Sequence, residues 1–304
     1  MKIGIVGLGR VGTSVAISTL QTGIARELLL ADARPGLAEG EAMDLAHGAA
    51  FYPSAAVRAA AVEDMRDCDA VVLAAGRGGR PEQSRLELLR DNAALVATLA
   101  GELRGLRGLL VVVSNPVDVL TQIATEASEL PAARVIGTGT MLDTARLRQV
   151  LGRELGVEPR SVHAQIVGEH GDSEAVLWSS AAVGGRGVRR WDGWSAAREA
   201  AIAHEVRRAA YEIIERKGAT NHAIGLVTAA FLRWSLRDER RVLTVSRVQD
   251  GAAGVRGVAL SLPAVVGRDG ATTIVVPDLD AAERDALARS AEVLHAARAS
   301  LRAR

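Results

Sequence analysis

The chain of 304 residues has one cysteine, two lysines and no long apolar run. The single cysteine, Cys68, excludes an internal disulfide and a cysteine metal cluster, and we expect it to be a buried thiol. No segment reaches the roughly 18 consecutive apolar residues that a membrane span needs, and the strand-like start at Lys2 has no signal-peptide pattern. We therefore expect a cytoplasmic protein without a membrane partner.

The cations are nearly all arginines, because only Lys2 and Lys217 are lysines. Any anion-binding site must therefore be built from arginine. The formal net charge of +1 argues against nucleic acid as a partner. Apolar residues make up 48% of the chain, enough for one large domain or two moderate ones.

The first half of the chain alternates apolar runs with segments of helical periodicity. The runs typical of strands are Lys2–Val6, Glu27–Ala31, Ala70–Ala74, Leu109–Ser114 and Arg134–Ile136. The segments typical of helices are Val11–Thr22, Gly36–Gly48, Arg85–Leu103 and Val119–Ser128. Alternation of this kind, with nearly continuous apolar strands, predicts a parallel sheet covered by helices on both faces.

The pattern changes after about residue 145. Helices are predicted at Thr144–Leu155, Ser195–Lys217, Ala219–Leu236 and Asp280–Ala303, and strands at Val162–Val167, Arg241–Val248 and Val258–Val266. The predicted fold is α/β: a Rossmann-type doubly wound domain over residues 1–143, followed by an α+β catalytic domain over residues 144–304.

A glycine motif follows the first predicted strand and precedes the first helix. In GLGRVG, Gly7 allows a tight turn, Gly9 lets the backbone approach a pyrophosphate, and Gly12 allows close helix–strand contact. Asp32 ends the second strand, where its carboxylate can bind ribose hydroxyls and repel a 2′-phosphate. Although Arg34 lies nearby, NAD is favoured over NADP.

Four distant segments carry polar residues suited to one chemistry. They are GEHGD with His170, DTAR with Asp143 and Arg146, SNP with Asn115, and the helix start at Arg85. Taken singly, each has an ordinary structural explanation, such as a core histidine, a helix-start ion pair or a turn. Their joint occurrence at the ends of elements, behind a dinucleotide motif, favours an active site.

Longer stretches resemble the lactate/malate dehydrogenase family, and in particular its L-lactate dehydrogenases. They include GTGTMLDTARLR, SVHAQIVGEHGDSE, SNPVDVLTQIA, EIIERKGATNHAIG and ALSLPAVVG, and the similarity runs from end to end of the chain. The combination of GEHGDS with DTAR is highly specific. The resemblance implies reversible hydride transfer between NADH and pyruvate or another 2-oxo acid.

The resemblance also implies a role for each site residue. His170 would exchange the proton of the substrate hydroxyl, and Asp143 would hold its ring. Arg146 would bind the substrate carboxylate in a bidentate fork, which lysine could not reproduce. Arg85 would close over the site and polarise the carbonyl. The remaining implied residues are Asn115, Thr220, Gly79 and Arg80 for substrate, and Gly7, Gly9, Val11, Gly12, Asp32, Gly76, Ser114, Asn115 and Thr138 for the cofactor.

The loop before Arg85 departs from the family pattern. Lactate enzymes typically carry glutamine, and malate enzymes arginine, at the position that Gly79 occupies here. Three substrates therefore stay open: pyruvate; oxaloacetate, if Arg80 or Arg77 pairs with its second carboxylate; or a bulkier 2-oxo acid in the space at Gly79.

Two positions suggest regulation. Arg148 and His163 coincide with residues that bind fructose 1,6-bisphosphate across a subunit interface in bacterial members of the family. They are equally compatible with ordinary surface positions. The apolar faces of Ala196–Ile214, together with the resemblance, predict a homo-oligomer, either a dimer or a tetramer.

Two other classes of function fit the sequence less well. An NAD- and metal-dependent glycosidase would need metal ligands, and Cys68 is misplaced for that role; no metal site is expected. An inactive NAD-binding module is disfavoured because the four catalytic candidates, His170, Asp143, Arg146 and Arg85, are all present.

Overall fold

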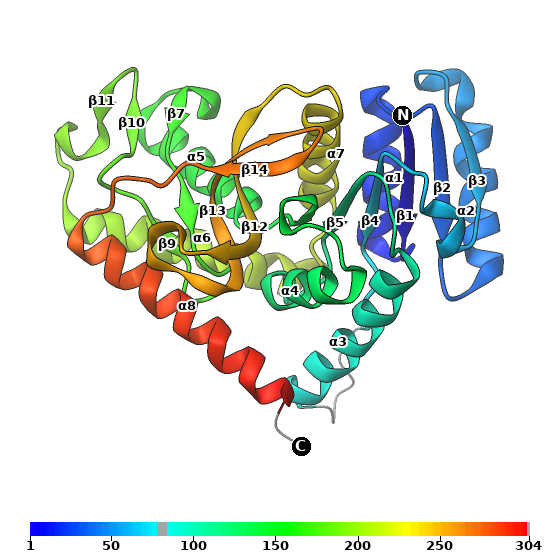
Figure 1. Cartoon of the computed structure of the whole chain (residues 1–304). Helices are drawn as coiled ribbons and strands as arrows, with labels where there is room; N and C mark the ends of the chain where they lie inside the picture. Colours follow the sequence, from blue (N-terminus) through cyan, green and yellow to red (C-terminus); the bar gives the residue numbers. More distant parts are fainter. Residues whose placement is uncertain (78–83, 303–304) are drawn as a thin grey trace.

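The protein is built around one large sheet (Figure 1), in a computed structural model that describes residues 1–77 and 84–302. Within these ranges the sheet has nine strands, in the spatial order β14-β13-β12-β6-β5-β4-β1-β2-β3. The strands from β3 to β6 in this order pair in parallel, which gives the predicted Rossmann-type arrangement. Their bounds are β1 Lys2–Val6, β2 Glu27–Ala31, β3 Ala56–Ala59, β4 Ala70–Leu73, β5 Leu109–Val112 and β6 Val135–Gly137.

Helices cover both faces of this sheet, as predicted. Those of the first half are α1 Arg10–Thr22, α2 Pro35–His47, α3 Arg85–Glu102 and α4 Val117–Ser128, and those of the second are α5 Met141–Leu155, α6 Ala196–Lys217, α7 His222–Leu236 and α8 Ala281–Arg302. In the part of the chain that the structure describes, no helix combines the length and apolar character needed to cross a membrane.

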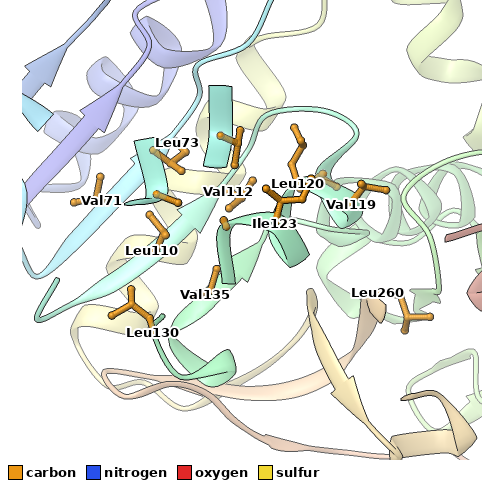
Figure 2. Close-up of a cluster of buried hydrophobic side chains, with 14 of the residues drawn as sticks. Val71, Leu73, Leu110, Val112, Val119, Leu120, Ile123, Leu130, Val135 and Leu260 are labelled. Atoms are coloured by element: carbon orange, nitrogen blue, oxygen red, sulfur yellow. The ribbon is translucent and has the colours of Figure 1, made fainter. Parts of the chain in front are cut away.

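Alternate residues of the parallel strands enter two separate cores. On β4, Ala70 and Val72 pack into the cluster that contains residues of α1, α2 and α7. Val71 and Leu73 pack into the opposite cluster, with residues of α3, α4 and α8, part of which Figure 2 shows. Because both faces are buried, these strands carry apolar side chains without the alternation of a solvent-facing sheet.

The ends of the helices follow the local sequence. Helix α3 begins with a capping box, in which the Ser84 hydroxyl accepts the Glu87 N–H at 3.2 Å and the Glu87 carboxylate accepts the Ser84 N–H at 2.8 Å. Helix α6 ends at Gly218, whose φ of +82° suits glycine best.

Three antiparallel strands from the second half of the chain extend the parallel sheet. Strands β12 (Arg241–Asp250), β13 (Arg256–Gly267) and β14 (Gly270–Ile274) are antiparallel, and Ser246 of β12 pairs with Gly137 of β6. A Cβ on Gly137 would lie 2.3 Å from Thr121 Oγ1 and 3.1 Å from Ser246 Cβ, so glycine is needed for this close approach. The two predicted halves therefore share one sheet. The predicted boundary between residues 143 and 144 lies within α5 and stays a prediction.

The strand predicted at Val162–Val167 is wrong as a single element. It divides into β7 (Val162–His163) and β8 (Ile166–Val167), which belong to different small sheets. At the start of β8, the Ile166 N–H donates to Thr144 Oγ1 at 3.0 Å. The partners of these strands are β9 (Ala175–Val176), β10 (Ala182–Val183) and β11 (Arg186–Gly187).

The first prediction concerns two glycines of the loop between β1 and α1. A Cβ on Gly12 would lie 1.8 Å from the Gly7 carbonyl oxygen, whereas a Cβ on Gly9 would meet nothing within 4 Å. We expect Gly12→Ala to lower the free energy of unfolding by at least about 2 kcal/mol, because backbone must move. Gly9→Ala is the matched control and should change it by less than about 0.5 kcal/mol. Urea unfolding measures both, and equal stability of the two variants would contradict the packing argument.

Candidate active site

A cavity of about 430 Å³ lies where the first half of the chain meets the second. Asn115 and Pro116, which follow β5, line it together with residues of α3, α5 and α6. The turn after β8 adds His170. The cavity thus lies beyond the carboxyl end of a parallel strand, where folds of this type bind their ligands.

Three predicted catalytic side chains meet in this cavity. Nδ1 of His170 lies 2.5 Å from Oδ2 of Asp143, and Nη1 of Arg146 donates to Oδ1 of the same carboxylate at 2.9 Å. Asp143 and Arg146 stand three residues apart in the first turns of α5, so they share one helix face. The Asp143 side chain is only 4% exposed, while His170 remains 25% exposed toward the cavity.

This arrangement favours a protonated imidazole. Burial disfavours the charge on His170, but the negative charge of Asp143 and the hydrogen bond to it outweigh burial and raise the pKa of His170 to about 9. Burial likewise disfavours the charge of Asp143, but His170 and Arg146 together hold its pKa below the usual range. The pair is therefore an imidazolium facing a carboxylate near neutral pH.

A buried carboxyl that sequence analysis did not single out fixes the backbone of His170. Asp118, in the first turn of α4, accepts the His170 N–H through Oδ2 at 2.7 Å. Burial raises the pKa of Asp118 to about 6, although the His170 N–H stabilises its charged form. Its position directly before the predicted helix Val119–Ser128, three residues after Asn115, was the available signal.

The glycine motif forms the expected turn between β1 and α1. Gly7 has a φ of +93°, and a Cβ there would lie 2.4 Å from the Ala75 backbone nitrogen. The Asp32 carboxylate lies at the end of β2, where it accepts the Leu8 N–H at 2.8 Å and the Arg34 N–H at 3.0 Å. Asp32 therefore joins the motif to the second strand, and Arg34 is its ion-pair partner.

The other cofactor candidates lie along the same sheet edge. Val11 is in the first turn of α1. Ser114 follows β5 and donates through its hydroxyl to the carbonyl of Ala75 at 2.5 Å, next to Gly76. Thr138 follows β6, and its N–H donates to the Val112 carbonyl at 3.0 Å. Asn115 accepts the Val117 N–H at 3.2 Å and lines the cavity.

Some predicted residues are not placed at the cavity. Gly79 and Arg80 lie outside the described residues. Arg85 begins α3, but its side chain is also outside the described part. Thr220, in the connection between α6 and α7, is half-buried and is not among the described residues that line the cavity.

The two candidates for regulation lie close together. The Arg148 guanidinium donates through Nε to the carbonyl of Ala164 at 3.0 Å, directly beside His163. His163 is exposed on β7, and burial lowers the pKa of Arg148. Among residues 1–77 and 84–302, no group of three or more His, Cys, Asp and Glu side chains is arranged to hold a metal ion.

Sequence analysis also missed several residues that line the cavity, among them Asn92, Glu174 and Arg207. Asn92 of α3 accepts the Arg77 N–H at 2.7 Å and so fixes the start of the loop that precedes the helix. Glu174 and Arg207 face the catalytic side chains. Asn92 and Arg207 stand within otherwise ordinary helical patterns, which gave no signal for a functional position.

Comparison with known proteins matches the whole chain to one family. Residues 1–137 match the NAD binding domain of lactate/malate dehydrogenase, and residues 140–303 match its alpha/beta C-terminal domain. The L-lactate dehydrogenase of Salinibacter ruber is 45% identical over 98% of this chain and 97% of its own length. That of Thermus aquaticus is 43% identical over 99% of both.

Solved structures agree with this result. The minor L-lactate dehydrogenase of Enterococcus mundtii, in its ligands-bound form, superposes with a TM-score of 0.96 at 38% identity, covering 100% of this chain and 99% of that one. A lactate dehydrogenase from a Medee basin deep-sea metagenome library gives the same TM-score at 39% identity, covering 99% of each chain. With two-domain matches, full-length relatives and a common fold, this chain belongs to the lactate/malate dehydrogenase family, and its first part is that family's NAD-binding domain.

Proposed function

We propose that this protein is an NAD-dependent L-lactate dehydrogenase, which interconverts pyruvate and L-lactate. The observation that carries the proposal is the group formed by His170, Asp143 and Arg146 in one cavity, with the distances given above. It supplies a proton donor, a partner that keeps the donor charged, and a guanidinium for a carboxylate. The relatives that span the full chain bear the name L-lactate dehydrogenase.

The residues of the first domain fit NAD. The open space at Gly9 leaves room for a pyrophosphate beside the N-terminus of α1, whose N–H groups attract anions. Gly7 and Gly12 shape this turn, Val11 begins the helix behind it, and Asp32 can accept hydrogen bonds from ribose hydroxyls. When bound, the nicotinamide supplies or accepts the hydride.

The nicotinamide half is assigned to the sheet edge beyond β4, β5 and β6. Gly76, Ser114, Asn115 and Thr138 follow these strands, and Asn115 also borders the cavity. We therefore assign Asn115 to both cofactor and substrate, since it stands between the two sites.

The chain's own residues handle the proton and the carboxylate. Reduction of a 2-oxo carbon creates an alkoxide, which takes the proton from the His170 imidazolium; in the reverse direction, neutral His170 removes it. Asp143 stabilises the imidazolium and orients its ring. Arg146, held by Asp143 through one nitrogen, is assigned to the substrate carboxylate.

Four further residues belong to the end of the site that receives the substrate side chain. We assign Arg85, Gly79, Arg80 and Thr220 to it by family pattern, with Arg85 polarising the carbonyl. We also propose that the domain boundary falls near residues 143 and 144, and that the protein is cytoplasmic, in keeping with a single cysteine that is buried.

Subunit association and regulation are further parts of the proposal. Large apolar side chains are exposed on α1, α7 and β12, among them Ile17, Leu226 and Val242, which supports a homo-oligomer. We propose that Arg148 and His163 bind fructose 1,6-bisphosphate between subunits, because they share one corner of the molecule and supply cationic groups.

The substrate is tested by steady-state kinetics on one preparation with NADH and pyruvate, oxaloacetate or 2-oxoisocaproate. We expect kcat/KM for pyruvate to exceed that for oxaloacetate by at least about tenfold, because Gly79, at the position where malate enzymes carry arginine, provides no cation for a second carboxylate. A preference for oxaloacetate or 2-oxoisocaproate would overturn the assignment to lactate.

The proton-transfer role is tested by His170→Asn. Asparagine neither donates nor accepts a proton near neutral pH, so kcat for pyruvate should fall by about a thousandfold, while NADH binding, followed by fluorescence, stays unchanged. His204→Asn, an exposed histidine of α6, is the matched control and should retain full activity. Near-normal turnover in the His170 variant would remove this residue from the mechanism.

Regulation is tested by the saturation curve for pyruvate with and without fructose 1,6-bisphosphate. We expect the sugar bisphosphate to lower the half-saturating pyruvate concentration at least about threefold, and fructose 6-phosphate to act less because it has one phosphate. Arg148→Gln should abolish the response. A wild-type curve that does not move would rule out this part of the proposal.

A further inference from the structure

A second buried carboxyl, Glu174, shares the cavity with His170. It lies in the turn between β8 and β9, and its side chain is only 2% exposed. Glu174 lines the same cavity as His170 and Arg146. Its Oε1 has no hydrogen-bond partner within the described residues. A buried carboxyl oxygen without a hydrogen bond is costly, so its retention here calls for a physical explanation.

A cation of α6 faces this carboxyl. Nε of Arg207 lies 3.9 Å from Oε1 of Glu174, which is an ion-pair distance too long for a hydrogen bond. Arg207 also lines the cavity. Its side chain is 39% exposed, so this ion pair has one buried member and one that contacts solvent. The pair therefore attracts by charge but leaves the carboxyl free to take up or release a proton.

The other charged and titratable groups around the cavity come from several elements. They are Asp143 and Arg146 on α5, His170, Glu169 and Asp172 on the turn after β8, Asp118 on α4, and Arg207 and Tyr211 on α6. Arg146 is bound to Asp143, Asp118 accepts a backbone N–H, and Tyr211 donates to Asp172 at 3.1 Å. Among the described residues of this set, two buried carboxyl oxygens have no hydrogen-bond partner, Oε1 of Glu174 and Oδ1 of Asp118. Of these two residues, Glu174 is the one that lines the cavity.

We propose that Glu174 is a positioning residue of the proton-transfer centre: its buried carboxylate, balanced by Arg207, extends to higher pH the range over which His170 keeps its proton. It acts through His170 and does not itself contact the reacting atoms. The kinetic part of this inference rests on the proposed reduction of pyruvate.

The pKa values of the two groups support this role. Burial and the charge of Asp143 raise the pKa of Glu174 to about 8, against the attraction of His170, Arg207 and Arg146. The pKa of His170 is raised to about 9, so the two groups titrate over overlapping pH ranges. As the pH rises, Glu174 gains a negative charge, which stabilises the imidazolium over the range in which His170 would otherwise lose its proton.

Glu174 should therefore affect the pH dependence of pyruvate reduction. Pyruvate reduction needs the imidazolium, so kcat/KM is maintained below the pKa of His170 and falls as the pH rises through it. Without an ionisable Glu174, the imidazolium loses this support. The fall should then begin at lower pH, while activity at acid pH stays unchanged.

The test is the pH profile of kcat/KM for pyruvate in Glu174→Gln, an isosteric change. At pH 6 we expect activity within about twofold of wild type, and the alkaline fall to shift downward by about half a pH unit to one unit. Glu174→Asp retains an ionisable carboxyl and should restore most of the wild-type profile. Glu205→Gln is the control, because this exposed carboxylate of α6 pairs with Arg153 away from the cavity.

Three results would overturn the inference: a Glu174→Gln profile that superposes on wild type, a loss that is equal at every pH, or the same shift in Glu205→Gln. An NMR titration of the His170 ring proton in the wild-type protein needs no variant and no turnover. It should show, besides the main inflection, an additional one from the ionisation of Glu174, and a single inflection would contradict the coupling. Wild-type protein inactive on pyruvate would instead refute the proposed function, while the NMR result would still decide the role of Glu174.

Discussion

The contact between His170 and Asp143 is the interaction on which the active site depends. An isolated carboxylate that is only 4% exposed would be costly, and it is stabilised here by an imidazole on one oxygen and a guanidinium on the other. The same contact turns an ordinary histidine into one that is protonated at neutral pH. The buried carboxylate of Asp143 therefore orients the His170 ring, keeps that ring protonated and holds Arg146 in position.

The sheet brings the parts of this contact together. Helix α5 follows β6, the strand that joins the parallel strands to β12. Gly137 permits that junction, because a side chain at this position would collide with Thr121 and Ser246. Asp118, at the start of the preceding helix α4, then holds the backbone of His170 across the junction. Close packing and catalytic geometry therefore depend on the same few positions.

The three buried carboxyls around His170 differ in pKa because their hydrogen-bond and ion-pair partners differ. Asp143 is bound by two cationic groups and stays charged; Asp118 binds a backbone N–H. Glu174 faces Arg207 without a hydrogen bond to its inner oxygen. The direction of each pKa follows from these contacts: lowered for Asp143, raised for Asp118 and Glu174.

Sequence alone determined the Rossmann-type sheet, most helix positions and the glycine turn between β1 and α1, because periodicity and short motifs are local signals. It also singled out His170, Asp143 and Arg146, which the structure brings together in one cavity. It missed the edge strand Ala56–Ala59, which is only four residues long, and it joined β7 to β8, whose partners differ. Only the tertiary structure decided that the hairpin β12–β13 extends the first sheet, that Asp118 anchors His170, and that Glu174 and Arg207 face the same cavity. These facts depend on contacts between residues far apart in the chain, which no local pattern records.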